Sequence, residues 1–123
     1  MTTPATPATP ATVIERTDDV VVIRVQVKDL DEAHTKAVHA EVNAAAAESP
    51  TLPVILDLSS VKFLPSLTLG AMVRLGQAFR ARNQRLVLVG LQPTIRQVLT
   101  ITKLDRMFEI QDDVAAALKA MSV

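Results

Sequence analysis

The side chain best placed for chemistry is the hydroxyl of Ser66. It follows Pro65 and directly precedes a segment with helical periodicity, so it lies where a helix is expected to begin. A phosphate on this hydroxyl would meet free N–H donors and the positive end of the helix dipole. The same position suits an N-cap, whose side-chain oxygen accepts from first-turn N–H groups. From the local sequence alone, the cap is the simpler interpretation.

The other ionisable residues lack the partners that catalysis requires. His34 and His39 are five residues apart on a predicted helix, without Cys or an HExxH pattern, and we expect both on the surface. Asp57 ends an apolar strand with no base nearby, so we expect it to bond to the following turn. Three glycines leave no Gly-rich phosphate loop. The chain is therefore predicted to be a binding protein, not an enzyme, with no metal or cofactor.

Composition narrows the possible partners. Thirteen basic residues balance 13 acidic ones, Trp, Tyr and Cys are absent, and no apolar run reaches the length of a membrane span. We therefore expect a cytoplasmic protein that does not insert into membranes. A basic stripe without aromatic residues is expected to be solvated and not to bind nucleic acid. It consists of Lys62, Arg74, Arg80, Arg82 and Arg85.

The chain is expected to hold one domain behind a tail. Residues 1–12 form a Thr-Pro-Ala repeat, which we expect to be disordered and solvated, and residues 13–123 form the domain. Strands are predicted at Val20–Val27 (paired with Val13–Ile14 across a turn at Thr17–Asp19), Val54–Leu58, Leu86–Val89 and Phe108–Ile110. Helices are predicted at Ala33–Glu48, Leu67–Arg82 and Pro93–Ile101, with a last one capped by Asp112.

This alternation indicates an α/β fold with a mostly parallel or mixed sheet of four to five strands, covered by about four helices. Each helix has an expected inward face. For the first these residues are Val38, Val42 and Ala45; for the second Leu69, Met72, Val73, Gly76 and Phe79; for the third Ile95, Val98 and Leu99; and for the last Val114, Ala117, Leu118 and Met121.

The segment DLSSVKFLPSLTLGAMVRL, residues 57–75, resembles the STAS domains of bacterial anti-sigma factor antagonists. That family has a strand ending in Asp-Leu-Ser, then Asp-Ser-Ser/Thr-Gly-Leu-Gly at a helix start. The matching residues are Asp57, Leu58, Ser59, Phe63, Leu64, Ser66, Leu69 and Gly70. Leu30–Asp31 and the segment Leu86–Ile110 are also similar to the family's pattern, so the likeness extends over nearly all of the chain after the tail.

The resemblance implies a STAS fold and a role in transcription regulation by partner switching. In that family a partner kinase, which is also the anti-sigma factor, phosphorylates the first Ser of the motif; by position the acceptor would be Ser66. The implied partners are a serine kinase of the histidine-kinase-like ATPase type and a PP2C-type phosphatase. The implied docking residues are Asp31, Lys62, Pro65, Ser66, Leu67 and Thr68. Leu67 would contact a partner if it points outward, although the first turn of a packed helix favours a core position.

Three differences from the motif keep an alternative open. Pro65 stands in place of the family's Asp, Leu67 in place of the second Ser/Thr, and Thr68 in place of Gly. These changes bear on kinase recognition more than on the fold. The alternative is a scaffold or transporter accessory subunit that is never phosphorylated. The sequence leaves open whether the domain is a monomer or a dimer, and whether it binds a small ligand.

Overall fold

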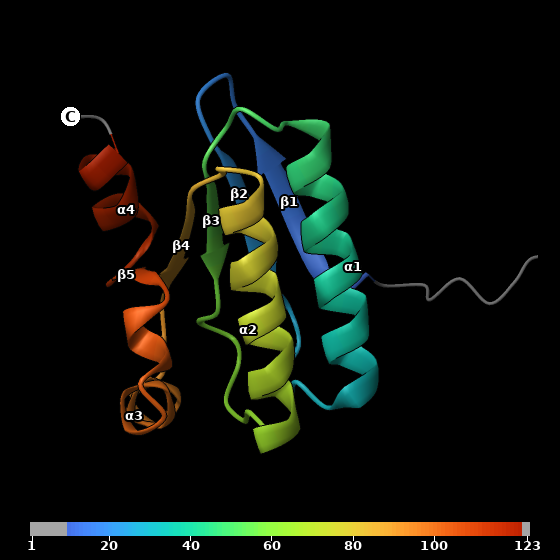
Figure 1. Cartoon of the computed structure of the whole chain (residues 1–123), viewed down its shortest axis with the longest axis vertical. Coiled ribbons are helices and arrows are strands. Elements are labelled where there is room, and N and C mark those ends of the chain that lie inside the picture. The colour runs from blue at the N-terminus through green and yellow to red at the C-terminus, as the bar shows by residue number, and fades with distance from the viewer. Residues whose placement is uncertain (1–9, 122–123) are drawn as a thin grey trace, which may run out of the picture.

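A computed structural model describes residues 10–121 as a five-stranded sheet with four α-helices (Figure 1). The strands are β1 (Thr12–Arg16), β2 (Val21–Val25), β3 (Val54–Asp57), β4 (Leu86–Val89) and β5 (Glu109–Gln111). The helices are α1 (Glu32–Glu48), α2 (Ser66–Ala81), α3 (Pro93–Ile101) and α4 (Val114–Met121), with a 3₁₀ turn η1 at Leu104–Arg106. The α/β fold with a mixed sheet is confirmed.

The strands lie in the order β1-β2-β3-β4-β5. β1 is antiparallel to β2, to which a short turn joins it, while β2 to β5 are mutually parallel because a helical segment lies between successive strands. The central strands β3 and β4 read VILD and LVLV, and their apolar residues are all buried. Such runs are typical of strands that are covered on both faces.

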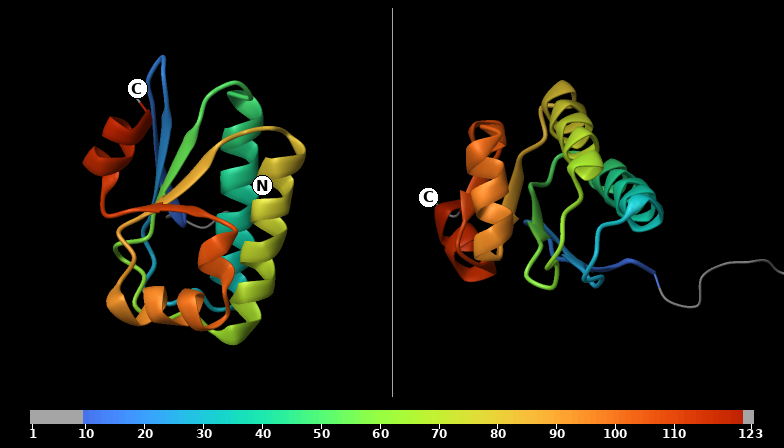
Figure 2. Two further views of the ribbon diagram at one scale, coloured as in Figure 1. Left: turned by 60° about the vertical axis from the view of Figure 1, so that its left-hand side comes forward. Right: turned by 90° about the horizontal axis from the view of Figure 1, so that it is seen from below.

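Helices lie on both faces of the sheet (Figure 2). On one face α1 and α2 lie side by side, and the larger core cluster there includes Val42, Leu56, Phe79 and Leu88. On the other face Ala117 of α4 packs in a smaller cluster with valines and an isoleucine of the central strands. Both clusters are aliphatic apart from two phenylalanines, as the composition requires.

The inward face of α2 differs from the prediction. Of the five residues expected to face inward, only Phe79 is buried, and the buried stripe is Thr68, Ala71, Leu75 and Phe79. The buried stripe still follows helical spacing. Because it includes a threonine and an alanine, the prediction from hydrophobicity shifted the inward face of α2 by about one residue. In the other helices Val38, Val42, Ala45, Ile95, Leu99 and Ala117 are buried as expected; Val98, Val114 and Met121 are partly buried, and Leu118 is exposed.

Two boundaries also need correction. β1 begins at Thr12, and Ala11 is buried in the core, so the folded domain starts before residue 13. The disorder expected for the rest of the tail concerns residues 1–9, which lie outside the described part. At the other end Asp113 precedes α4, and its Oδ1 accepts from the Ala116 N–H at 2.8 Å, so Asp113 caps the helix instead of Asp112.

Candidate docking site at the start of α2

Two loops meet at the carboxyl ends of β2 and β3 and lead into α1 and α2. The Leu30 N–H donates to the Phe63 carbonyl at 3.1 Å, and the Lys62 N–H donates to the Lys28 carbonyl at 2.8 Å. Asp29 and Phe63 form a parallel bridge. These bonds bring Asp31, Lys62 and the start of α2 to one end of the molecule, at the edge where ligands of open α/β sheets commonly bind.

Ser66 is the first residue of α2 and is exposed. The N-cap is Pro65, with φ −61° and ψ 150°, and it supplies no side-chain cap bond. The interpretation of Ser66 as the N-cap was therefore wrong: proline's fixed φ starts the helix one residue earlier. Within residues 10–121, the Ser66 hydroxyl and the N–H groups of Ser66 and Leu67 have no hydrogen-bond partner.

Thr68 does not belong to the exposed surface. Its side chain is buried, and its hydroxyl donates to the Leu30 carbonyl at 2.7 Å and lies 3.2 Å from the Thr35 hydroxyl. A partner cannot reach it while α2 stays in place. The expected docking role of Thr68 is therefore wrong, because helical spacing turns position 68 toward α1. Its role is to tie the first turn of α2 to the loop before α1.

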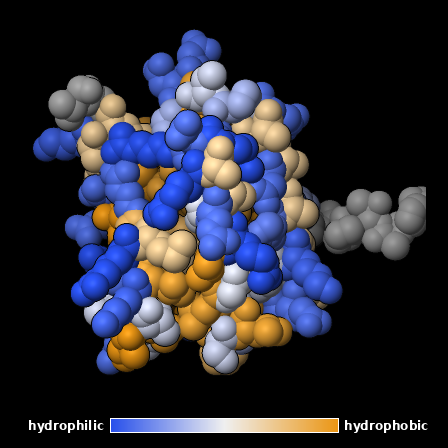
Figure 3. All heavy atoms as spheres, in the orientation of Figure 1, coloured by the Kyte–Doolittle hydropathy of each residue, from blue (hydrophilic) through white to orange (hydrophobic). Residues whose placement is uncertain are grey.

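Leu67 and Phe63 supply an exposed apolar surface beside Ser66. Leu67 is 70% exposed, so the core position favoured for it in the sequence was wrong, and Phe63 is 58% exposed. Figure 3 shows hydrophobic side chains gathered at the lower end of the molecule, where α2 begins and α3 lies. These exposed apolar side chains make the start of α2 a candidate interaction surface.

The remaining expected site residues border this surface. Asp31 caps α1: its Oδ1 accepts from the His34 N–H at 2.9 Å, and its side chain stays exposed. Lys62 is exposed and Pro65 is half-buried. Asp57 has the structural role expected for it, because its Oδ1 accepts from the Ser59 N–H at 2.9 Å.

The predicted basic stripe is partly neutralised. Arg85 forms an ion pair with Glu109 at 2.6 Å, and the guanidinium of Arg82 lies 4.6 Å from the centre of the Phe79 ring. Among the described residues, no cluster of three or more acidic, histidine or cysteine side chains could hold a metal ion. No helix within residues 10–121 is both long and apolar enough to cross a bilayer.

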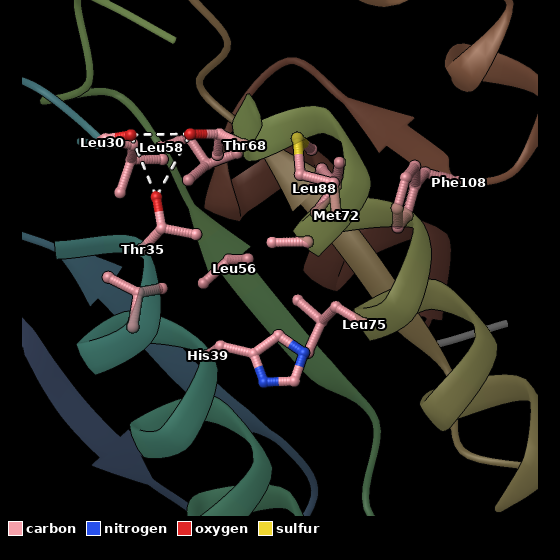
Figure 4. A pocket seen from close by; sticks show the side chains of 12 residues that line it. Leu30, Thr35, His39, Leu56, Leu58, Thr68, Met72, Leu75, Leu88 and Phe108 are labelled. Carbon is pink, nitrogen blue, oxygen red and sulfur yellow. Dashed lines mark hydrogen bonds between the residues drawn. The ribbon is translucent and has the colours of Figure 1, made fainter. Parts of the chain in front are cut away.

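Sequence reasoning missed a pocket between α1 and α2 (Figure 4). Aliphatic side chains make up most of its lining, and His39 borders it from α1. His39, which was expected on the surface, is half-buried, and its Nε2 is buried without a hydrogen-bond partner. No sequence pattern points to this pocket, because it arises from the packing of two helices whose contact residues are distant in the chain.

A family model described as the STAS domain matches residues 11–117. The chain belongs to the STAS domain family. Among solved structures, an anti-sigma factor antagonist from Mycobacterium paratuberculosis is 26% identical, with a TM-score of 0.77; the match covers 98% of this chain and 100% of that one.

Two further solved structures agree in fold. An anti-sigma-factor antagonist (STAS) domain protein from Planctomyces limnophilus is 22% identical, with a TM-score of 0.79, over 93% of this chain and 99% of that one. The Bacillus cell fate determinant SpoIIAA in its phosphorylated form is 22% identical, with a TM-score of 0.66; the match covers 89% of this chain and 99% of that one. This STAS chain thus has the fold of anti-sigma factor antagonists over nearly its full described length.

Proposed function

We propose that this STAS domain is a cytoplasmic protein-binding switch of the anti-sigma factor antagonist type. Its partner would be an anti-sigma factor that is also a serine kinase of the histidine-kinase-like ATPase type, and a PP2C-type phosphatase would reverse the modification. The phosphoacceptor would be Ser66. The unmodified form would hold the kinase and release the sigma factor, and the phosphorylated form would let the kinase go.

One observation carries this proposal: an exposed hydroxyl stands at the first residue of α2, next to the 70%-exposed Leu67 and near the 58%-exposed Phe63. A kinase can reach such a hydroxyl without unfolding the helix. An apolar partner surface can cover Leu67 and Phe63 at the same time. The proposed docking surface therefore consists of Asp31, Lys62, Phe63, Pro65, Ser66 and Leu67.

The local electrostatics support a phosphate at this position. The first turn of α2 contains no acidic residue, and the N–H groups of Ser66 and Leu67 lack acceptors among the described residues. A phosphate would therefore gain hydrogen bonds and a favourable helix dipole. It would also add about −1.5 to −2 charges beside the apolar side chains of Phe63 and Leu67, which strongly disfavours docking of an apolar partner surface.

The direct test incubates the full chain with ATP and the kinase encoded by a neighbouring gene, and maps phosphate by mass spectrometry. We expect phosphate on Ser66 and no modification of Ser66→Ala. Ser66→Asp should lower the affinity for the kinase by about tenfold or more, whereas Ser60→Asp, at an exposed position in the preceding loop, should not. Phosphate found only at Ser59, Ser60 or Thr68 would contradict the assignment.

The alternative is a scaffold or transporter accessory subunit that uses the same surface without modification. Pro65 at the helix start, in place of an acidic residue, is the feature that favours it. In that case Ser66→Asp would bind the partner as tightly as the unmodified chain, while Leu67→Asp would abolish binding. Ser66→Asp and Leu67→Asp together therefore distinguish a switched surface from a constitutive one.

A further inference from the structure

We propose that the pocket between α1 and α2 binds a short aliphatic carboxylate, with its alkyl end among the aliphatic side chains and its carboxylate beside Lys36, His39 and Arg74. The proposal is independent of phosphorylation at Ser66. It rests on three observations: an apolar pocket, a buried donor without a partner, and two cations at the entrance.

The donor is the Nε2–H of His39, and its tautomer follows from the neighbouring bonds. The Asn43 amide nitrogen donates to the His39 carbonyl at 3.0 Å, and the Asn43 amide oxygen accepts from Arg82 at 3.3 Å, which fixes the orientation of the amide. The same amide nitrogen lies 3.0 Å from Nδ1 of His39, so Nδ1 must accept. In the neutral ring the proton is then on Nε2.

The ring is neutral under ordinary conditions, because burial, and then the nearby charge of Arg74, lower the pKa of His39. Figure 4 shows one ring nitrogen directed toward Leu75 on α2. Since Nδ1 bonds to Asn43 on its own helix, the nitrogen that faces α2 is Nε2. This N–H lacks an acceptor within residues 10–121, and an unpaired buried donor is costly.

Water is a poor occupant of this pocket. A buried water needs two to four polar partners. The other polar side chains of the lining are Thr35 and Thr68, whose hydroxyls both donate to the Leu30 carbonyl and lie 3.2 Å apart. Within residues 10–121, the Nε2–H is the donor of this lining that lacks an acceptor, so the pocket favours an apolar molecule with a single acceptor group.

The entrance selects for negative charge. A surface hollow of about 200 Å³ adjoins the pocket and shares Thr35, His39 and Ala71 with it. Lys36 and Arg74 line this hollow, and within residues 10–121 neither forms an ion pair. A carboxylate in the hollow can bind both cations and accept from Nε2–H.

The size of the pocket limits the alkyl chain. The pocket itself measures about 40 Å³, which admits the narrow end of an alkyl chain and not an aromatic ring or a nucleobase. Met72 lines the same space and can adjust its flexible side chain to a guest. A chain of roughly four to six carbons fits this combination of pocket and hollow.

The test titrates the full chain with hexanoate and follows the Met72 methyl and His39 ring signals by NMR. We expect saturable shifts of both, with weaker binding of acetate, hexanol and hexylamine, which lack either the chain or the negative charge. In the free protein, the His39 nitrogen shifts should report the Nε2–H tautomer. If neither signal moves, or if acetate and hexanoate act alike, the proposal is wrong.

Variants locate the contacts. Lys36→Met and Arg74→Met should each weaken hexanoate binding by up to about fivefold, and the double variant by the product, because both are exposed cations. His39→Leu should abolish the ring contact and weaken binding further. Lys103→Met, an exposed cation beyond α3, is the matched control and should bind normally. Equal effects of Lys103→Met and Lys36→Met would show nonspecific attraction and overturn the site.

Discussion

The hydroxyl of Thr68 donates to the main-chain carbonyl of Leu30 at 2.7 Å, so the first turn of α2 is bonded to the residue that precedes the α1 cap. The Thr35 hydroxyl donates to the same carbonyl at 2.9 Å. One buried acceptor thus holds the starts of both helices. These two helix starts carry the proposed docking surface, so the shape of that surface depends on this carbonyl.

This shared acceptor predicts non-additive stability effects. Thr68→Val keeps the side-chain volume but removes one donor, and should lower the free energy of unfolding by about 1 kcal/mol. Thr35→Val should cost a similar amount. The double variant should cost more than the sum, because it leaves the Leu30 carbonyl without either hydroxyl. Urea denaturation of the four proteins measures the coupling, and strict additivity would contradict the shared role.

Gln84 is predicted to be essential at the end of α1. Its side-chain nitrogen lies within 3.2 Å of three carbonyls, those of Ala46, Ser49 and Leu52, where α1 ends and turns toward β3. Gln84→Met retains the length but removes the donor, and should cost about 2–3 kcal/mol. Gln77→Met, at an exposed position of α2, should change stability by less than about 0.5 kcal/mol. Equal midpoints for the two variants in thermal unfolding would refute the capping role.

The sequence predicted the elements with strong local signals and missed features that depend on packing. Pro93 starts α3 and Gly90 follows β4, and the predicted bounds of both elements match the structure. The face of α2 was misjudged because buried Thr68 and Ala71 are weak hydrophobic markers.

For the residues of the proposed docking surface, the sequence indicated the position in the fold but not the exposure of each side chain. The site residues around Ser66 were placed at one helix start, and most of them lie there. The exposure of Leu67 and the burial of Thr68 were reversed, because both follow from how α2 is rotated against α1. The His39 pocket had no signal at all, since its lining comes from elements that meet only in the folded chain.

Glycine is required at position 90 by both backbone and space. Gly90 has φ +72°, and a Cβ there would lie 2.8 Å from Oδ1 of Asp57 and 2.9 Å from Cβ of Ser59. Gly90→Ala should therefore cost about 2 kcal/mol or more, combining left-handed backbone strain with the contacts.

Gly70→Ala is the matched control on exposed α2, where the nearest atom is a flexible arginine nitrogen at 3.6 Å. It should instead stabilise the protein by about 0.5–1 kcal/mol. In denaturant unfolding, the two variants should change the free energy of unfolding in opposite directions. A Gly90→Ala protein that is more stable than the unmodified chain would contradict this account of Gly90.

The ion pair between Arg85, which directly precedes β4, and Glu109 of β5 predicts an acid-sensitive contribution to stability. Arg85 donates to both oxygens of Glu109, at 2.8 and 2.6 Å, and this hydrogen bonding lowers the pKa of Glu109 below its usual 4.5. A carboxyl with a lowered folded-state pKa stabilises the fold above its unfolded pKa, and this contribution is lost as the pH falls through the folded value.

Glu109→Gln should therefore lower stability at pH 7, and this effect should fade as the pH falls through the lowered pKa of Glu109. Both side chains are partly exposed, so the loss at pH 7 should be modest, about 0.5–1 kcal/mol. Asp112→Asn is the control. The Asp112 carboxylate is exposed and lies 3.8 Å from Arg96, so its loss should change stability little at either pH. Unfolding curves at pH 7 and pH 3 measure the difference. A Glu109→Gln effect of the same size at both pH values would show that the side chain acts through packing and not through its charge.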